Sequence, residues 1–286
     1  MSSVFIAVSL ILLSHLGFTQ SAKEKVLICS YEFNNDKELK DWQIEGEGKA
    51  FIRNGKLILE PDHFQMLKKM MDEGKLSKKN DVSEYQPYVI AAMTQKYGKE
   101  ISQYYVNSNA DAEPGTKDAQ FLGGNFNFWN TRFPTGTDFS ITFDFKCLYP
   151  APLHMIMFSA LGTNGKGIFD KTFPKRYGLS SEIMTGQLNN YRISFFEPDR
   201  KTANLRKAPG RKLLYEGEDV VSKDPDKTYH CEIKKIAAEI SYIVDGKTIF
   251  SYIDSQPLGG GYWGFRLMPC ALGQYDNINV YKILNQ

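Results

Sequence analysis

The chain has 286 residues, a formal net charge of +2 and 42% hydrophobic residues, and 13% of its residues are aromatic. This composition excludes an intrinsically disordered chain, a collagen and a coiled coil. The near balance of 35 basic and 33 acidic side chains also excludes a binder of bulk polyanions such as a histone.

The N-terminus has the features of a signal peptide. Its first 22 residues contain no Lys, Arg, Asp or Glu, and Val4 to Phe18 form an almost continuous apolar run. A run of about fifteen residues is too short to span a bilayer and has the length of a signal-peptide core. Cleavage is expected after Ser21 or Ala22. We therefore expect residues 1–22 to be removed, and the protein to be periplasmic or secreted without a membrane anchor.

Strand patterns begin after this segment. Between Lys25 and Glu60, Asn54-Gly55 separates two apolar runs, which predicts a type I′ hairpin. Export permits disulfides, but the four cysteines form no CxxC pair, and buried thiols and one disulfide both remain open. They are spread along the chain: Cys29, Cys147, Cys231 and Cys270.

Residues 61–118 have a different character. Apolar residues at helical spacing start at Phe64 and stop at Gly74, which predicts one helix. A second helix is expected to begin at Pro87 and to reach Tyr97, and residues 107–118 are typical of a loop. Long insertions of this kind usually shape a binding cleft or cover a surface.

From Phe121 to the end the pattern is again that of strands. One run puts four apolar residues on a single face: Phe139, Ile141, Phe143 and Phe145. Asp245-Gly246 predicts a second type I′ hairpin. About ten short strands separated by turn signals predict an all-β sandwich of the jelly-roll kind. We expect one domain over residues 23–286, with a helical insertion at about 61–118.

Several catalytic motifs are missing from the sequence, namely GxSxG, a phosphate-binding loop, GxGxxG after a strand, and HExxH. Sandwich glucanases of the laminarinase type carry three acids spaced ExDxE on one strand, whereas the corresponding run ITFDFKC has only Asp144. An inverting pair drawn from separate strands stays open, with Asp144, Glu182 and Glu197 as candidates.

The stretch 200–212 contains six basic residues and no acid: Arg200, Lys201, Arg206, Lys207, Arg211 and Lys212. It is either a solvated loop or an anion site, where Arg supplies a forked donor and Lys a point charge. The patch is too small to favour nucleic acid as the partner of an exported protein. A carboxylated or sulfated glycan is the favoured ligand.

Three further residues each have a structural and a functional interpretation. Arg266 lies within an apolar strand and needs either a protein carboxylate or a ligand carboxylate. His154 opens another apolar strand, as a structural histidine or as a functional one. Trp129 either stacks on a sugar or packs in the core.

Five strings, FWNTRFP, KRYG, NNYRISFF, TANLRKAPG and GFRLMP, occur in the order and spacing of the YesU-like family. The chain resembles this family over about residues 121–283, and more loosely over 26–60. The resemblance implies a concanavalin-like jelly roll and a role in polysaccharide degradation. Arg192 stands where the family pattern has His, Glu197 where it has Arg, and residues 61–118 lie outside the pattern.

The chain also resembles the ulvan-oligosaccharide dehydratases of marine bacteria. This resemblance implies removal of water across C4–C5 of a terminal uronic acid, which leaves a 4,5-unsaturated residue. Elimination beside a carboxylate needs groups that neutralise the carboxylate, a base for the C5 proton and an acid for the leaving oxygen. Nearby cations would lower the pKa of a tyrosine in either role. No metal or organic cofactor is required.

We therefore expect a carbon–oxygen lyase, an oligosaccharide dehydratase, acting on an acidic oligosaccharide. The expected base and acid come from Tyr191, Tyr177 and His154. The expected substrate-binding residues are Arg176, Asn189, Arg192, Asn204, Arg206, Lys207, Arg266 and Trp129. The alternatives are a non-catalytic glycan-binding module and a glycoside hydrolase.

Overall fold

A computed structural model describes residues 24–77, 82–98, 125–178, 182–183 and 186–284 of the chain. The predicted signal peptide and the predicted loop at 107–118 lie outside these residues. Within them, no helix is long and apolar enough to cross a membrane.

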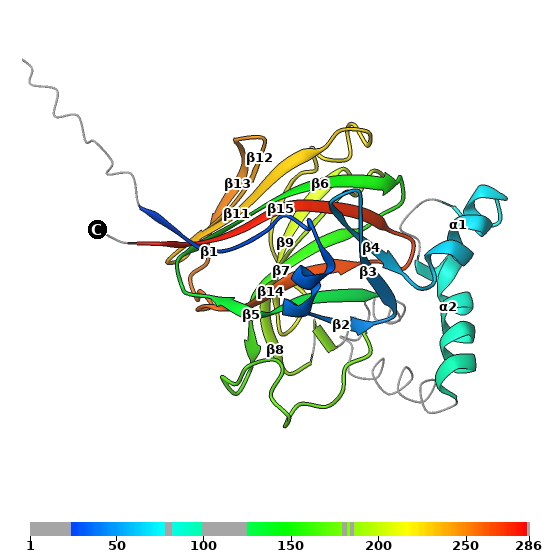
Figure 1. Ribbon diagram of the computed structural model, residues 1–286, viewed down its shortest axis with the longest axis horizontal. Helices are drawn as coiled ribbons and strands as arrows, with labels where there is room; N and C mark the ends of the chain where they lie inside the picture. Colours follow the sequence, from blue (N-terminus) through cyan, green and yellow to red (C-terminus); the bar gives the residue numbers. More distant parts are fainter. Residues whose placement is uncertain (1–23, 78–81, 99–124, 179–181, 184–185, 285–286) are drawn as a thin grey trace, which may run out of the picture.

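The described residues form two antiparallel β-sheets that pack face to face (Figure 1). Sheet A has the strand order β13-β12-β11-β6-β15-β4-β3, with β1 paired to β15. Its strands are β1 (Lys25–Tyr31), β3 (Gly48–Arg53), β4 (Lys56–Pro61), β6 (Phe139–Tyr149), β11 (Tyr229–Ile236), β12 (Glu239–Val244), β13 (Lys247–Ile253) and β15 (Leu272–Ile283).

Sheet B has the strand order β10-β9-β8-β7-β14-β5-β2. Its strands are β2 (Trp42–Gly46), β5 (Phe126–Thr135), β7 (His154–Gly162), β8 (Leu188–Phe195), β9 (Thr202–Ala208), β10 (Lys212–Glu218) and β14 (Gly261–Leu267). After residue 121 the described residues form eleven strands, β5 to β15, close to the roughly ten predicted there, and the predicted sandwich architecture is confirmed. A short 3-10 helix, η1 (Asp36–Asp41), precedes β2.

The period-2 alternation of the strands places one face of each sheet in a shared core. All four residues predicted to share a face of β6 are buried there. Phe143 of sheet A meets Phe265 of sheet B edge to face, with ring centroids 5.2 Å apart. Trp42 stacks on Phe128 at 4.6 Å. The inward faces are mainly apolar, and the outward face of sheet B carries most of its Arg and Asn side chains.

Both predicted type I′ hairpins are confirmed. Asn54 and Gly55, which join β3 to β4, have φ values of 53° and 68°. Asp245 and Gly246, which join β12 to β13, have φ values of 50° and 77°. Positive φ at both central residues defines this turn, and its twist matches that of the flanking strands.

Two helices, α1 (Phe64–Asp72) and α2 (Val82–Tyr97), lie between β4 and β5 in the sequence and at one end of the sandwich (Figure 1). Contrary to the prediction, Pro87 lies inside α2 rather than at its start. Burial explains the earlier start, because Tyr85 packs in one cluster with Val89 and Met93. The same cluster contains Met155 and Met268 of the sandwich, so the helices cover part of sheet B.

All four cysteines are buried and free, which decides between the two alternatives left by the sequence. Burial raises the pKa of the Cys29, Cys147 and Cys270 thiols to about 12. These thiols are therefore protonated at neutral pH and serve as small apolar side chains.

Gly264 is required where β14 passes closest to β5. A Cβ atom at this position would lie 2.4 Å from the Phe128 carbonyl oxygen and 2.8 Å from Trp129 Cα. We predict that Gly264→Ala lowers the free energy of unfolding by about 2 kcal/mol. Gly259→Ala is the control, because its Cβ would meet nothing within 4 Å. Urea denaturation measures both, and equal midpoints for the two variants would contradict the prediction.

Candidate functional site

The outward face of sheet B carries two neighbouring rows of functional side chains. In the first row, Arg266 pairs with Asn127 of β5 on one side and with Met155 of β7 on the other. The row continues from Met155 to Ser194 of β8 and Asn204 of β9. Residues paired in this way have adjacent side chains on the same face.

The second row brings two arginines together. It runs from Trp129 through Gly264 and Met157 to Arg192, and Arg192 pairs directly with Arg206. Like charges directly opposite each other are unfavourable in a sheet. We call Arg192, Arg206 and Arg266, together with Asn127, Asn190 and Asn204, the arginine face.

Arg192 is the most unusual residue of the arginine face. Only 2% of it is exposed, and its Nη1 and Nη2 atoms have no hydrogen-bond partner in the part of the chain that the structure describes. The charged groups acting on it are other arginines, foremost Arg206 and then Arg266. Burial and these charges lower its pKa from 12.5 to about 9, so it remains charged at neutral pH. A buried charge without a partner costs several kcal/mol, which a bound anion would offset.

The asparagines of the arginine face also have hydrogen-bonding capacity to spare. Buried amide atoms lack a partner among the described residues at Asn127 Nδ2, Asn190 Oδ1 and Asn204 Oδ1. Amides offer both donors and acceptors, which suits the hydroxyl groups of a sugar. Buried polar groups in folded proteins are normally satisfied, so this concentration of spare donors and acceptors makes the arginine face a candidate ligand-binding surface.

Arg266, in contrast, is held by the protein. It is fully buried, and its Nη1 atom donates to Asn127 Oδ1 at 2.8 Å and to the Gly178 carbonyl at 3.4 Å. Burial lowers its pKa to about 10, while Glu182, Glu45 and Tyr85 act in the opposite direction. The partner required for Arg266 is thus supplied within the chain.

The groups around Arg266 include side chains able to transfer protons. Tyr177 directly precedes Gly178, and its backbone N–H donates to both carboxylate oxygens of Glu182, at 2.8 and 2.9 Å. The Tyr177 ring meets that of Tyr97 at the end of α2, with centroids 6.1 Å apart. Tyr85 of α2 is 4% exposed. Of the three predicted catalytic residues, only Tyr177 lies beside the arginine face.

Tyr191 and Lys207 lie on the opposite, inward side of sheet B, which corrects their predicted roles. Tyr191 donates to Asp254 Oδ2 at 2.5 Å and accepts from the Leu258 N–H at 2.9 Å. Burial and Asp254 raise the pKa of Tyr191, the reverse of the expected lowering. Lys207 Nζ lies 2.8 Å from Asp254 Oδ2 and is engaged in the same network.

His154 is a structural histidine, so its predicted catalytic role is also corrected. It is fully buried in the core, and its Nδ1 atom lies 2.9 Å from Tyr275 Oη. Burial lowers its pKa from 6.5 to about 3. Asn189 is likewise displaced from the site, because strand alternation turns it away from the side on which Asn190 lies.

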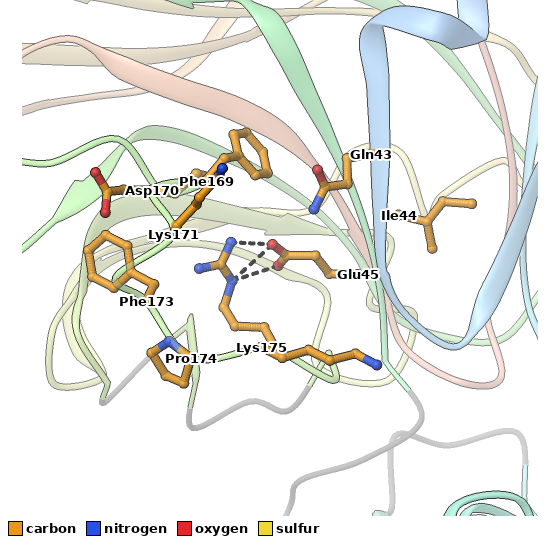
Figure 2. Close-up of a pocket in the computed structure, with 11 residues that line it drawn as sticks. Gln43, Ile44, Glu45, Phe169, Asp170, Lys171, Phe173, Pro174 and Lys175 are labelled. Atoms are coloured by element: carbon orange, nitrogen blue, oxygen red, sulfur yellow. Dashed lines mark hydrogen bonds and ion pairs between the residues drawn. The ribbon is translucent and has the colours of Figure 1, made fainter.

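Trp129 and Arg176 are used within the fold. Trp129 is on the outward face of sheet B but is fully buried beside Ile168 and Ile183, which excludes an exposed stacking platform. Its indole N–H donates to Glu45 Oε2 at 2.9 Å. Arg176 Nε lies 2.9 Å from both oxygens of the same carboxylate (Figure 2). Glu45 thereby ties the loop after β7 to strand β2.

The acids considered for hydrolysis do not gather on one face. Asp144 alternates outward on sheet A and lies 2.7 Å from His230 Nδ1. Glu197 is buried and lies 2.8 Å from Arg200 Nη2, while Glu182 lies beside Arg266. Within the described residues, no three His, Cys, Asp or Glu side chains are grouped so as to hold a metal ion.

The sequence did not predict Asn127, Asn190 or Tyr85 as site residues, and it indicated Glu182 only as a candidate acid for hydrolysis. Asn190 could have been found from the sequence, because it lies two positions before Arg192 and therefore on the same face of β8. We predicted its neighbour Asn189 instead. Tyr85 lies on α2, and the sequence of this helix does not show which of its faces packs against sheet B.

These sheets and their outward polar face define a galectin-like jelly roll. Residues 94–280 match the family described as a domain of unknown function, DUF1961, and the chain belongs to that family. The uncharacterized protein YesU of Bacillus subtilis is 29% identical over 175 residues, which cover 56% of this chain and 79% of that protein. The predicted YesU-like resemblance is thereby confirmed.

The fold is also shared with a solved structure. A protein of unknown function with a galectin-like fold from Bacillus subtilis superposes with a TM-score of 0.65 at 21% identity. The alignment covers 93% of this chain and 100% of that chain. The family match begins at residue 94, so α1 and most of α2, including Tyr85, precede it.

The two buried arginines should respond oppositely to replacement. Arg192→Met removes an unpartnered buried charge and should raise the free energy of unfolding by about 1 kcal/mol or more. Arg266→Met leaves Asn127 Oδ1 without its donor and should lower it by about 2 kcal/mol. Chemical denaturation without ligand measures both variants. A loss of stability in Arg192→Met comparable to that in Arg266→Met would contradict the account of Arg192.

His154 makes stability depend on pH. Its pKa of about 3 in the folded protein lies below the ordinary value of 6.5, which applies in the unfolded chain. Between these two pH values only the unfolded chain binds the proton. The free energy of unfolding should therefore fall as the pH drops through this window, by about 1.4 kcal/mol per pH unit from this residue. His154→Gln should have a correspondingly shallower profile. Parallel profiles for the two proteins would show that His154 is not excluded from protonation.

Proposed function

We propose that the protein is an exported carbohydrate-active enzyme that eliminates water, or a sugar, from an oligosaccharide containing uronic acid. Oligosaccharides of ulvan are the substrate class implied by the sequence resemblance, and the product is a 4,5-unsaturated uronate. The observation that carries the proposal is the buried guanidinium of Arg192, which lies near Arg206 and Arg266 and whose Nη atoms have no hydrogen-bond partner among the described residues. A carboxylate is the anion that a forked guanidinium recognises best on a sugar.

Elimination needs the carboxylate of the uronate to be neutralised, because its charge opposes removal of the neighbouring C5 proton. The C5–H bond breaks and its electrons form the C4=C5 double bond, while the C4–O bond breaks and the departing oxygen takes up a proton. Arg192 meets the carboxylate, and Arg206 adds positive charge beside it. Fixed charges in a site that excludes water act strongly on charge that develops during the reaction.

The proton-transfer groups come from the segments that cover the arginine face. Tyr177 keeps the role predicted for it, as one of the two proton-transfer residues. Glu182 and Tyr85 are the other candidates, since both act on the charge of Arg266. A tyrosine or carboxylic acid in hydrogen-bond reach of the C5 proton or of the C4 oxygen is sufficient for each step.

The predicted signal peptide is consistent with this substrate, because polysaccharides are degraded outside the cytoplasm. We propose that the mature chain starts near Lys23 and acts in the periplasm or after secretion. The competing proposal is a non-catalytic glycan-binding module. An assay for the unsaturated product distinguishes this module from an enzyme.

The mature chain is mixed with uronate-ended oligosaccharides from ulvan and from pectin. Ultraviolet absorbance detects the conjugated double bond, and mass spectrometry follows the saccharides. Rising absorbance with loss of one water supports a dehydratase, and rising absorbance with chain cleavage supports a lyase that expels a sugar. No change in absorbance or in mass with either substrate would overturn the elimination proposal and favour the binding module.

Arg192→Gln should lower kcat/KM by about 100-fold or more, because the carboxylate loses its charged partner. Lys212→Gln is the matched control, since Lys212 is an exposed member of the same basic stretch and begins the edge strand β10. Its kcat/KM should stay within about twofold of the wild type. Equal losses in the two variants would mean that general positive charge, rather than Arg192, supports the reaction.

A further inference from the structure

A second concave site lies at the edge of sheet B, beside β2. It is a pocket of about 290 Å³ between β2 and the loop that follows β7 (Figure 2). Its volume is near the lower end of the range for small-molecule sites, which suits one sugar unit. The residues that line it include Gln43, Phe169, Lys171, Phe173, Lys175 and Arg176.

The walls of this pocket combine aromatic rings with a polar group. Figure 2 shows the Phe173 ring on one side of Glu45 and the Gln43 side chain on the other. Phe169 is fixed edge-on by Tyr262, with ring centroids 5.0 Å apart. The C–H faces of a pyranose pack well on such rings, while an amide such as that of Gln43 can bind its hydroxyl groups.

The floor of the pocket is rigid. Arg176 uses Nε and Nη2 to hold Glu45, and only 8% and 5% of the two side chains are exposed. Glu45 is fixed a second time by the indole of Trp129. A pre-organised floor lowers the entropy that binding must overcome.

The charges around the pocket favour an anionic sugar. The Glu45 carboxylate is matched by Arg176, and Asp170 accepts bonds from the hydroxyl and N–H of Thr172, at 2.5 and 2.8 Å. Lys171 and Lys175 are exposed on the same loop. Three basic side chains, Lys171, Lys175 and Arg176, face two acidic ones, Glu45 and Asp170, so the lining has a formal charge of +1.

We propose that this pocket is a second saccharide site, which binds one acidic pyranose unit apart from the arginine face. The inference rests on the proposed function for the class of ligand. Gln43 stands in the same register row as Arg192, four strands away through Trp129, Gly264 and Met157. At a strand spacing of ~4.8 Å, Gln43 and Arg192 lie roughly 19 Å apart. The pocket adjoins only the far edge of the arginine face, where Glu45 pairs with Asn127, so the sugar unit in the pocket is not the unit that Arg192 binds.

The test measures binding in the Arg192→Gln protein, whose arginine face is disabled. Isothermal titration calorimetry with tetragalacturonate should still detect binding. Adding Phe173→Ala or Lys171→Gln should weaken that residual affinity by about tenfold, and neutral cellotetraose should bind about tenfold more weakly than tetragalacturonate. The control Lys49→Gln, which removes an exposed charge from the neighbouring sheet, should leave it unchanged.

Three results would overturn the inference: no residual binding, residual affinity that neither pocket variant changes, or equal affinity for cellotetraose. Proton–nitrogen NMR of the wild-type protein gives a second measurement that does not depend on the variants folding. The Gln43 side-chain amide signals should shift on adding tetragalacturonate, and unchanged signals would also overturn the inference.

The experiments distinguish an error about the second saccharide site from an error about the proposed elimination. Unsaturated product without binding at the pocket overturns the second site and leaves the elimination intact. Binding at the pocket without unsaturated product from either polysaccharide leaves the second site intact and overturns the elimination.

Discussion

The outward face of sheet B depends on one constraint, a buried positive charge whose Nη atoms find no hydrogen-bond partner within the described ranges of the chain. Arg192 is surrounded by other arginines rather than by carboxylates, and its guanidinium is withdrawn from water. A fold selected for stability alone would place an apolar side chain or an ion pair there. The cost is explained when the missing counter-charge belongs to a ligand, and functional sites commonly carry such a cost.

The rest of the molecule makes that arrangement possible. The apolar core between the sheets fixes the register of β14, β7, β8 and β9, and this register brings Arg266, Arg192 and Arg206 onto one surface. The loop after β7 and helix α2 then cover the surface, with Gly178 bound to Arg266 and Tyr85 acting on its charge. The sandwich supplies rigidity, and the covering segments supply the proton-transfer groups of the proposed reaction.

Much of the fold could be predicted from the sequence because its signals are local. The Asn54-Gly55 and Asp245-Gly246 turns and the alternation of β6 each depend on a few adjacent residues. The start of α2 could not be predicted, because burial of Tyr85 in a cluster of distant residues outweighs the local effect of Pro87. Propensity is a weak guide where tertiary packing decides.

The grouping of the arginines could be predicted from the sequence, but the other members of the candidate site could not. Arg192, Arg206, Arg266 and Asn204 lie together, as the prediction of a basic surface requires, and anion binding there stays a prediction. Tyr191 and Lys207 were included because they adjoin these residues in sequence, although alternation sends adjacent residues to opposite faces. The face of a strand that meets the core, and the acid that pairs with a half-buried lysine, depend on long-range contacts such as that of Lys207 with Asp254, 47 positions away.

The central claim is that Arg192 receives the carboxylate of a uronate. The most direct measurement is NMR of the arginine side chains in nitrogen-15-labelled protein, with signals assigned by substitution, as a uronate-ended oligosaccharide of ulvan is added. The account predicts a saturable shift of the Arg192 signals that follows the binding curve. Binding of the oligosaccharide with unchanged Arg192 signals would contradict it.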